Sequence, residues 1–226
     1  MKKSKFLGVL ALVLGCFAVV FLMDTPLFLK YRNGEIKDYN SVQFGELKKG
    51  DLVQGTIDDT DGQVAEMEET NTMFGIPTSK RTTSRYYALY TYDDIYVLYE
   101  TAKESELKQL DKIAEESTAY YTALQEAYEQ DGEDADYSAI EPPTATLEFT
   151  GEVKEMPDDL KEIFRQWYGD GFDEDCETDI IISYSNYDRF SWVIYAGAGC
   201  AVLAIVMLVL AIAALRKEKR DQQFSY

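Results

Sequence analysis

The chain has 226 residues, of which 22 are Lys or Arg and 41 are Asp or Glu, so its formal net charge is −19 at pH 7. A chain this acidic repels nucleic acid, and we expect no nucleic-acid partner. It contains no His, which excludes Ser-His-Asp and Cys-His catalysis, His-ligated zinc and a His-based pH switch.

Two uncharged apolar runs lie near the ends of the chain, at 6–23 and 190–215. Each is long enough to cross the hydrocarbon core of a bilayer, about 30 Å thick, as a helix. The runs therefore predict a membrane protein with one large loop between two spans. The expected segments are a cytoplasmic N-terminus (1–5), transmembrane helix 1 (6–23), an extracytoplasmic acidic α+β domain (24–189), transmembrane helix 2 (190–215) and a cytoplasmic tail (216–226).

Basic residues flank both runs on their outer sides. They are Lys2, Lys3, Lys5, Arg216, Lys217, Lys219 and Arg220. Short basic flanks stay in the cytoplasm, so we expect both termini on the cytoplasmic side of a cell membrane and the loop on the other side. The loop has 15 Lys and Arg against 39 Asp and Glu, a net charge of −24. Solubility alone explains this charge; attraction of cations or of a basic partner is the functional alternative.

The first run also allows two readings in which it is cleaved. A signal peptide fits the Lys-rich start, but no A-x-A-like site follows it. Val13-Leu14-Gly15-Cys16 resembles a bacterial lipoprotein cleavage box, but the residues after Cys16 are apolar rather than polar. We therefore expect an uncleaved span.

Small residues in both runs would let the two helices approach closely, as a hairpin or in a homo-oligomer. The candidates for helix packing are Gly8, Gly15, Gly197, Gly199 and Ala201. Ordinary lipid-facing Ala and Gly content is the alternative. Neither run holds an ionisable residue, which argues against transport by this chain alone.

The first half of the loop is predicted to form strands. Asn33-Gly34 is a strong hairpin signal between 28–31 and 35–39. Further strands are expected at 50–57 and 63–67. Residues 85–100 form a hairpin with apolar or aromatic residues on both faces, so it should lie near the centre of the domain. The polar stretch 68–84 is predicted to be a long loop, in which Met73, Phe74 and Ile76 are a possible partner contact.

The second half alternates helices and strands. Thr101-x-x-Glu104 is typical of a capping box that opens a long helix, with an exposed linker following at 129–143. The remaining elements are a strand at 146–154, a helix from Pro157 to Gly169 and a strand at 178–184. The expected fold class is α+β: an antiparallel sheet, for which a partly open barrel is one option, with two helices and two flanking transmembrane helices.

Candidate chemical sites are few. Acidic clusters at 58–62, 129–134 and 170–179 do not match an EF-hand loop, so we expect no metal site. Cys176 is the one cysteine of the loop, and we expect its side chain to be exposed. Its acidic neighbours should raise the pKa of the thiol. No carboxylate lies in an apolar run where burial would raise its pKa. We therefore expect no catalytic residue and no cofactor.

The arrangement as a whole resembles uncharacterised two-span membrane proteins of Gram-positive bacteria. The resemblance rests on the motifs at 44–57 and 147–153, the Tyr-rich hairpin and the two spans. It implies a small extracytoplasmic β-rich domain and carries over no catalytic residue. We expect a non-enzymatic binding or scaffolding protein of the cell envelope, with a protein partner or a second copy in the membrane. The alternatives are a carboxylate-dependent hydrolase and an accessory subunit of a transport complex.

Overall fold

The computed structural model describes residues 3–43, 45–73, 76–132 and 135–223, without the side chains of 3, 69–82 and 221–223. The contacts between residues divide the chain into two units. The first, here called the helical unit, comprises Met1–Gly34 and Asn186–Tyr226. The second, the sheet unit, comprises Glu35–Ser185.

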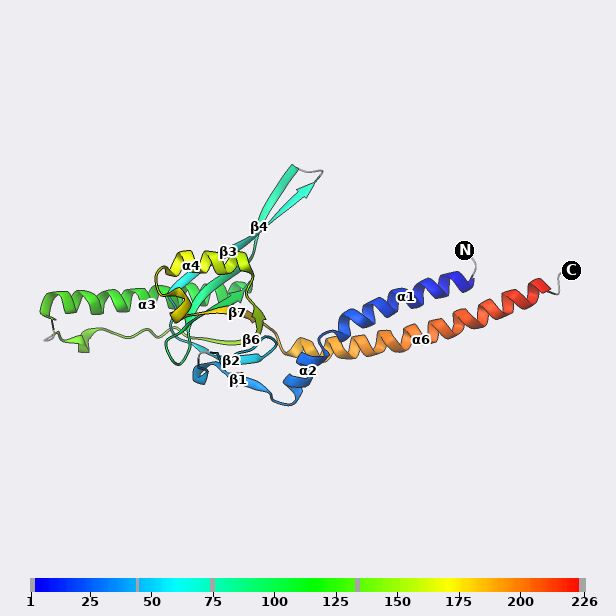
Figure 1. Ribbon diagram of the computed structural model, residues 1–226, viewed down its shortest axis with the longest axis horizontal. Helices are drawn as coiled ribbons and strands as arrows, with labels where there is room; N and C mark the ends of the chain where they lie inside the picture. The colour runs from blue at the N-terminus through cyan, green and yellow to red at the C-terminus, as the bar shows by residue number, and fades with distance from the viewer. Residues whose placement is uncertain (1–2, 44, 74–75, 133–134, 224–226) are drawn as a thin grey trace. The chain divides into compact units, whose positions relative to one another are not determined.

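Two long helices form the helical unit, α1 (Lys3–Leu22) and α6 (Asp188–Gln223). Both are long and apolar enough to cross a membrane. They run side by side in opposite directions, which places the start of α1 beside the C-terminal part of α6 (Figure 1). At that end, the amide and the hydroxyl of Ser4 donate to the two carboxylate oxygens of Glu218, at 3.4 and 3.0 Å.

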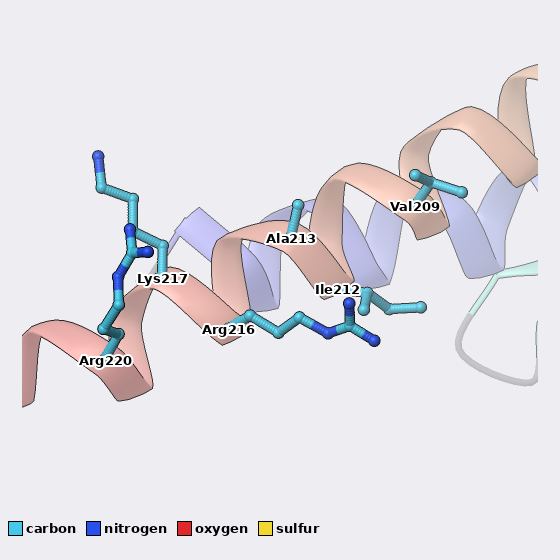
Figure 2. Close-up of a pocket in the computed structure, with 6 residues that line it drawn as sticks. All are labelled: Val209, Ile212, Ala213, Arg216, Lys217 and Arg220. Atoms are coloured by element: carbon cyan, nitrogen blue, oxygen red, sulfur yellow. The ribbon is translucent and has the colours of Figure 1, made fainter. Parts of the chain in front are cut away.

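The opposite end of this hairpin is held by close backbone approach and by aromatic rings. A Cβ added to Gly197 would lie 3.0 Å from Cβ of Phe21 and 3.1 Å from the Leu22 side chain. Beyond them, the Tyr31 ring lies 5.5 Å from the ring of Tyr187, between centroids. Near the chain ends, one side of α6 carries an open pocket of about 620 Å³ (Figure 2).

The predicted hairpin around Asn33-Gly34 is wrong, because residues 28–31 lie in helix α2 (Thr25–Arg32). Pro26 stands in its first turn, where a missing N–H costs nothing. Gly34 has φ of +72°, and its N–H donates to the carbonyl of Tyr31 at 3.1 Å. The glycine thus ends a helix instead of making a hairpin turn. A glycine with positive φ is common at both kinds of position.

Seven strands form one mixed sheet over the described residues, in the order β1-β2-β6-β7-β5-β4-β3. The strands are β1 (Ile36–Asp38), β2 (Leu52–Ile57), β3 (Gly62–Met73), β4 (Ile76–Tyr90), β5 (Tyr96–Thr101), β6 (Leu147–Glu155) and β7 (Cys176–Tyr184). The α+β class is confirmed. The wholly antiparallel arrangement is wrong, because β1 pairs with β2, and β5 with β7, in parallel. The sheet is open rather than closed into a barrel.

More helices accompany the sheet than the two that the sequence predicts. They are α3 (Glu104–Asp131), α4 (Asp158–Tyr168), the short α5 (Phe172–Asp175) and the 3-10 turns η1 (Tyr39–Ser41) and η3 (Tyr137–Ala139). The helix from Pro157 is confirmed as α4. The capping box is wrong: Lys103 is the N-cap of α3, and Thr101 still belongs to β5.

Strand β5 and residues 86–89 of β4 are buried on both faces, as the sequence predicts. On one face, Tyr87 and Leu89 join a cluster with Leu110 and Ile113 of α3. On the other face, Tyr86 and Ala88 join a second cluster. Its further members are Leu98, Met156, Leu160, Phe164, Phe172, Cys176 and Ile181. Helix α3 therefore covers one face of the sheet, and α4 and α5 cover the other.

The long loop predicted at 68–84 is also wrong, because residues 68–73 and 76–84 continue strands β3 and β4. Figure 1 shows the two strands leaving the body of the sheet as a ribbon. Threonine is frequent in this part of the sequence and favours extended backbone. The pairing of β3 with β4 is irregular, with register shifts at Gln63/Ala65, Met67/Glu68 and Asn71/Thr72.

Gly151 of β6 allows β6 and β7 to pack closely. A Cβ at this position would lie 2.5 Å from Cγ2 of Ile182 and 3.2 Å from the carbonyl oxygen of Ser183. Ile182 is fully buried, so its methyl group has little room to move.

We predict that Gly151→Ala lowers the free energy of unfolding by about 1–3 kcal/mol, the usual cost of overpacking a core. Chemical denaturation of the full-length protein in detergent, followed by circular dichroism, measures this loss. Glu148→Ala, on the exposed side of the same strand, is the control and should change stability by no more than about 0.5 kcal/mol. Equal effects of the two substitutions would contradict the steric argument.

Candidate functional site

The candidate site is built on the loop 58–61, which connects β2 to β3. Thr60 anchors this loop: it is buried, its hydroxyl donates to the carbonyl of Ala88 at 2.6 Å, and it accepts from the amide of Gly62 at 3.1 Å. Asp59 and Asp61 flank Thr60 on either side. The loop is thus fixed against β4 through Thr60, and the carboxylates of Asp59 and Asp61 can accept hydrogen bonds from other side chains.

Three tyrosines form hydrogen bonds around these carboxylates. Two donate to a carboxylate directly, and the third donates to one of those two tyrosines. The Tyr96 hydroxyl donates to Oδ2 of Asp61 at 2.5 Å. The hydroxyls of Tyr90 and Tyr96 are 2.7 Å apart; since the Tyr96 proton points to Asp61, Tyr90 is the donor of this pair. On the other side, the Tyr121 hydroxyl of α3 donates to Oδ2 of Asp59 at 2.7 Å. We call these five residues the tyrosine–aspartate cluster.

A small pocket of about 180 Å³ lies beside this cluster. Its lining residues are Tyr39, Asn40, Ile57, Asp58, Asp59, Tyr90, Thr91 and Tyr92. Asn40 fixes one wall, because its side chain pairs with the amide and the carbonyl of Thr56, both at 2.8 Å. Oδ1 of Asp59 is buried without a hydrogen-bond partner. Buried polar atoms usually have a hydrogen-bond partner, so this oxygen could accept a hydrogen bond from a donor group of a ligand.

The tyrosines act as neutral donors. Burial, followed by hydrogen bonding, raises the pKa values of Tyr90 and Tyr96 above the ordinary range. The hydrogen bond to Asp59, followed by burial, raises the pKa of Tyr121 to about 12. None of these phenols would lose its proton near neutral pH, so they orient the carboxylates instead of serving as bases or nucleophiles.

A pocket of this size is smaller than the 300–1,000 Å³ that is usual for small-molecule sites. It suits a single group such as an ammonium or guanidinium, not a whole substrate. Among the described residues, no three or more Cys, Asp and Glu side chains converge to hold a metal ion. The arrangement therefore favours recognition of one cationic group through Asp59 and the surrounding rings.

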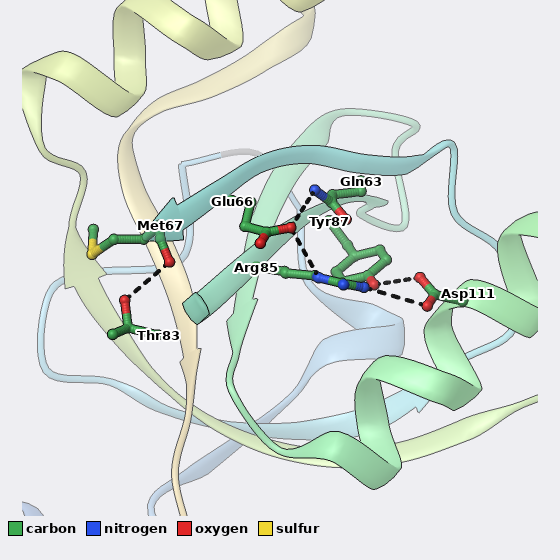
Figure 3. A network of polar contacts seen from close by, with 7 residues as sticks. All are labelled: Gln63, Glu66, Met67, Thr83, Arg85, Tyr87 and Asp111. Carbon is green, nitrogen blue, oxygen red and sulfur yellow. Dashed lines mark hydrogen bonds and ion pairs between the residues drawn. The ribbon is translucent and has the colours of Figure 1, made fainter. Parts of the chain in front are cut away.

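A polar network holds α3, and with it Tyr121, in place against the β3–β4 hairpin (Figure 3). Nε of Arg85 on β4 lies 3.3 Å from the carboxylate of Glu66 on β3, and its Nη1 lies 3.5 Å from that of Asp111 on α3. The Tyr87 hydroxyl also donates to Asp111, at 2.5 Å. These contacts join α3 to both strands of the β3–β4 hairpin.

Among the side chains that the structure describes, two carboxylates are buried, although neither lies in an apolar run of the sequence. Glu106 is 2% exposed and accepts from Tyr99, Thr101 and Lys103 at 2.9, 2.8 and 3.1 Å. These partners satisfy it, and it fastens the start of α3 to β5. Glu177 is 8% exposed and accepts from the amide of Gly45 at 2.7 Å. Burial raises the pKa of the Glu177 carboxyl.

Cys176 is buried, which corrects the expectation of an exposed thiol. It packs in the second cluster with Phe164 and Phe172. Burial, helped by Asp175 and Asp173, raises the pKa of the thiol to about 12. The predicted direction of this shift is confirmed, but burial is its main cause.

The sequence-predicted packing residues are distributed over both membrane-type helices. Gly197 lies against α1, whereas a Cβ at Gly8, Gly15 or Gly199 would meet no heavy atom within 4 Å. Ala201 is half-buried. The proposed contact at Met73, Phe74 and Ile76 lies outside the residues whose side chains the structure describes. The tyrosine–aspartate cluster was not predicted, although its aspartates belong to one of the acidic clusters noted in the sequence.

No family model matches the chain, and no curated protein or solved structure is significantly similar to it. The resemblance to two-span proteins of Gram-positive bacteria therefore stays a prediction.

Glu177 gives a prediction on pH dependence. Because its pKa is higher in the folded protein than in the unfolded chain, its carboxyl favours folding at low pH, and this contribution is lost as the pH rises through the raised pKa. Glu177→Gln stays neutral and can still accept from Gly45. We expect this variant to melt at a higher temperature than the native protein at pH 7, by a margin that shrinks toward pH 4.

Glu148→Gln is the matched control, since it removes the same charge from an exposed position. Thermal melts of both variants at pH 4 and pH 7 measure the effect. A Glu177→Gln gain no larger than that of Glu148→Gln at pH 7 would show that bulk charge, and not burial, is responsible.

Proposed function

We propose that the chain is a non-enzymatic, membrane-anchored binding or scaffolding protein of the bacterial cell envelope. Helices α1 and α6 span the cell membrane, both termini lie in the cytoplasm, and the sheet unit lies outside. The sheet unit binds a cationic group of an envelope protein at the pocket beside Asp59.

Segregation of charge supports the anchoring part of this proposal. The helical unit has 10 Lys and Arg against 4 Asp and Glu, a net charge of +6. The sheet unit has 12 against 37, a net charge of −25. The hairpin of α1 and α6 brings its two basic ends together, which agrees with a cytoplasmic position for both.

The single observation that carries the binding part is that Asp59, which lines the pocket, has one carboxylate oxygen, Oδ1, that is buried without a hydrogen-bond partner. A carboxylate that is already oriented by Tyr121 loses little freedom when it binds a donor. The negative charge of the whole unit would also attract a basic partner over a distance. A protein partner is favoured over a free small molecule because the pocket holds one group only.

The proposed topology predicts opposite labelling of two introduced cysteines. In a chain whose native cysteines are replaced by Ser, Ser138→Cys should react with a membrane-impermeant maleimide in intact cells. Lys219→Cys should react only after the membrane is permeabilised. Mass-shift electrophoresis reads out both reactions, and the reverse pattern would contradict the topology.

The proposed pocket predicts that Asp59→Asn weakens binding of a basic peptide. With tetralysine as the probe, we expect a loss of about ten-fold or more in affinity, because a hydrogen bond to a charged group contributes about 1.5–3 kcal/mol. Calorimetric titration of the full-length protein in detergent measures the affinity.

Asp170→Asn is the matched control: it removes one charge from an exposed position of the same unit and should change affinity less than two-fold. Equal losses from the two substitutions would show that the peptide responds to overall charge. Tyr121→Phe keeps every charge but frees Asp59 from its donor, and it should give an intermediate loss.

A further inference from the structure

The open pocket near the C-terminal end of α6 is lined by one continuous stripe of that helix. Its lining residues are Val209, Ile212, Ala213, Arg216, Lys217 and Arg220, at steps of three and four residues. This spacing places all six on one face of the helix, and all six are exposed. The stripe is apolar in its first half and cationic in its second half.

The stripe faces away from α1. Ala211 is 4% exposed, and the carboxylate of Glu218 binds Ser4 of α1. At 100° per residue, these two positions lie on the side of α6 opposite the stripe. Glu218, the carboxylate that lies between Lys217 and Arg220 in the sequence, is therefore occupied on the other side of the helix, while Asp221, which follows Arg220, has no described side chain.

Figure 2 shows how the side chains lie along the stripe. The guanidinium of Arg216 extends along the helix toward Ile212, whereas the side chains of Lys217 and Arg220 extend together in the other direction, away from it. Among the described residues, none of the three cations forms an ion pair with a carboxylate. Three cations that have no carboxylate partner among the described side chains, beside an apolar surface, match an anionic headgroup joined to acyl chains.

The geometry points to a binding site for an anionic phospholipid on α6, with the lipid phosphate at Arg216, Lys217 and Arg220 and the start of an acyl chain on Ile212 and Val209. Arg suits the phosphate because its planar donors can bind two oxygens at once. The volume of about 620 Å³ has room for a headgroup with its glycerol. This inference rests on the membrane insertion proposed above and adds a specific lipid to it.

Native mass spectrometry of the full-length protein in detergent tests the site, with phosphatidylglycerol and phosphatidylcholine of the same acyl chains as probes. We expect tighter binding of phosphatidylglycerol. Arg216→Gln and Arg220→Gln should each weaken it about five-fold, since one basic residue at a membrane surface contributes about 1 kcal/mol. Phosphatidylcholine binding should change little.

Lys219→Gln is the control, because Lys219 is exposed on the same turn of α6 but outside the stripe. It should change phosphatidylglycerol binding less than two-fold. Equal losses from Lys219→Gln and Arg216→Gln, or equal affinity of the native protein for the two lipids, would overturn the site. Binding of inorganic phosphate as tight as that of the lipid would overturn the lipid assignment in favour of a free anion.

Extraction of the protein from carbonate-washed membranes tests membrane insertion separately from the lipid site. Protein released without detergent would contradict membrane insertion itself. Protein that needs detergent but does not discriminate between the two lipids would contradict the lipid site alone. Helical content, measured by circular dichroism, should be the same in all variants.

Discussion

Burial of both faces of the central strands is the constraint on which the sheet unit depends. Tyr87 and Leu89 of β4 point to one cluster, and Tyr86 and Ala88 point to the other. Each face has to be covered, so α3 packs on one side and α4 with α5 on the other. Covering two faces requires helical connections that cross the sheet, and such connections bring β5 and β7 together in parallel. The same crossing places Tyr121 of α3 over the loop that carries Asp59.

Local signals in the sequence were sufficient for the strands and helices that they mark directly. Pro157 opens α4, and the alternating tyrosines mark β4 and β5. Two local signals were ambiguous: Asn33-Gly34 suits a hairpin turn and a helix end equally, and the Thr-rich stretch after Glu68 is polar enough to resemble a loop. The parallel pairs had no local signal at all, because they join segments separated by whole helices.

The candidate site was harder to predict than the fold for the same reason. Asp59 and Tyr121 are 62 residues apart, and Glu177 and its donor Gly45 are 132 residues apart. A carboxylate in an acidic stretch looks exposed in the sequence, and only the tertiary contacts decide whether it is buried. Composition and the placement of charge nevertheless indicated the division of the chain into a basic, apolar part and an acidic, folded part. Both proposed sites follow that division, a cation site on the acidic unit and an anion site on the basic one.

The irregular pairing of β3 affects how copies of this chain can meet. An open sheet has two edge strands, each with backbone groups that could pair with another chain and start aggregation. Here β1 is only three residues long, and β3 is broken by three shifts in register and carries Glu66 and Glu68. A second sheet could not pair with either of these two strands over a long regular stretch. Residues 76–84 of β4 extend beyond the end of β5 and pair with β3 alone, so strand pairing between copies of the chain is left to this part of the hairpin.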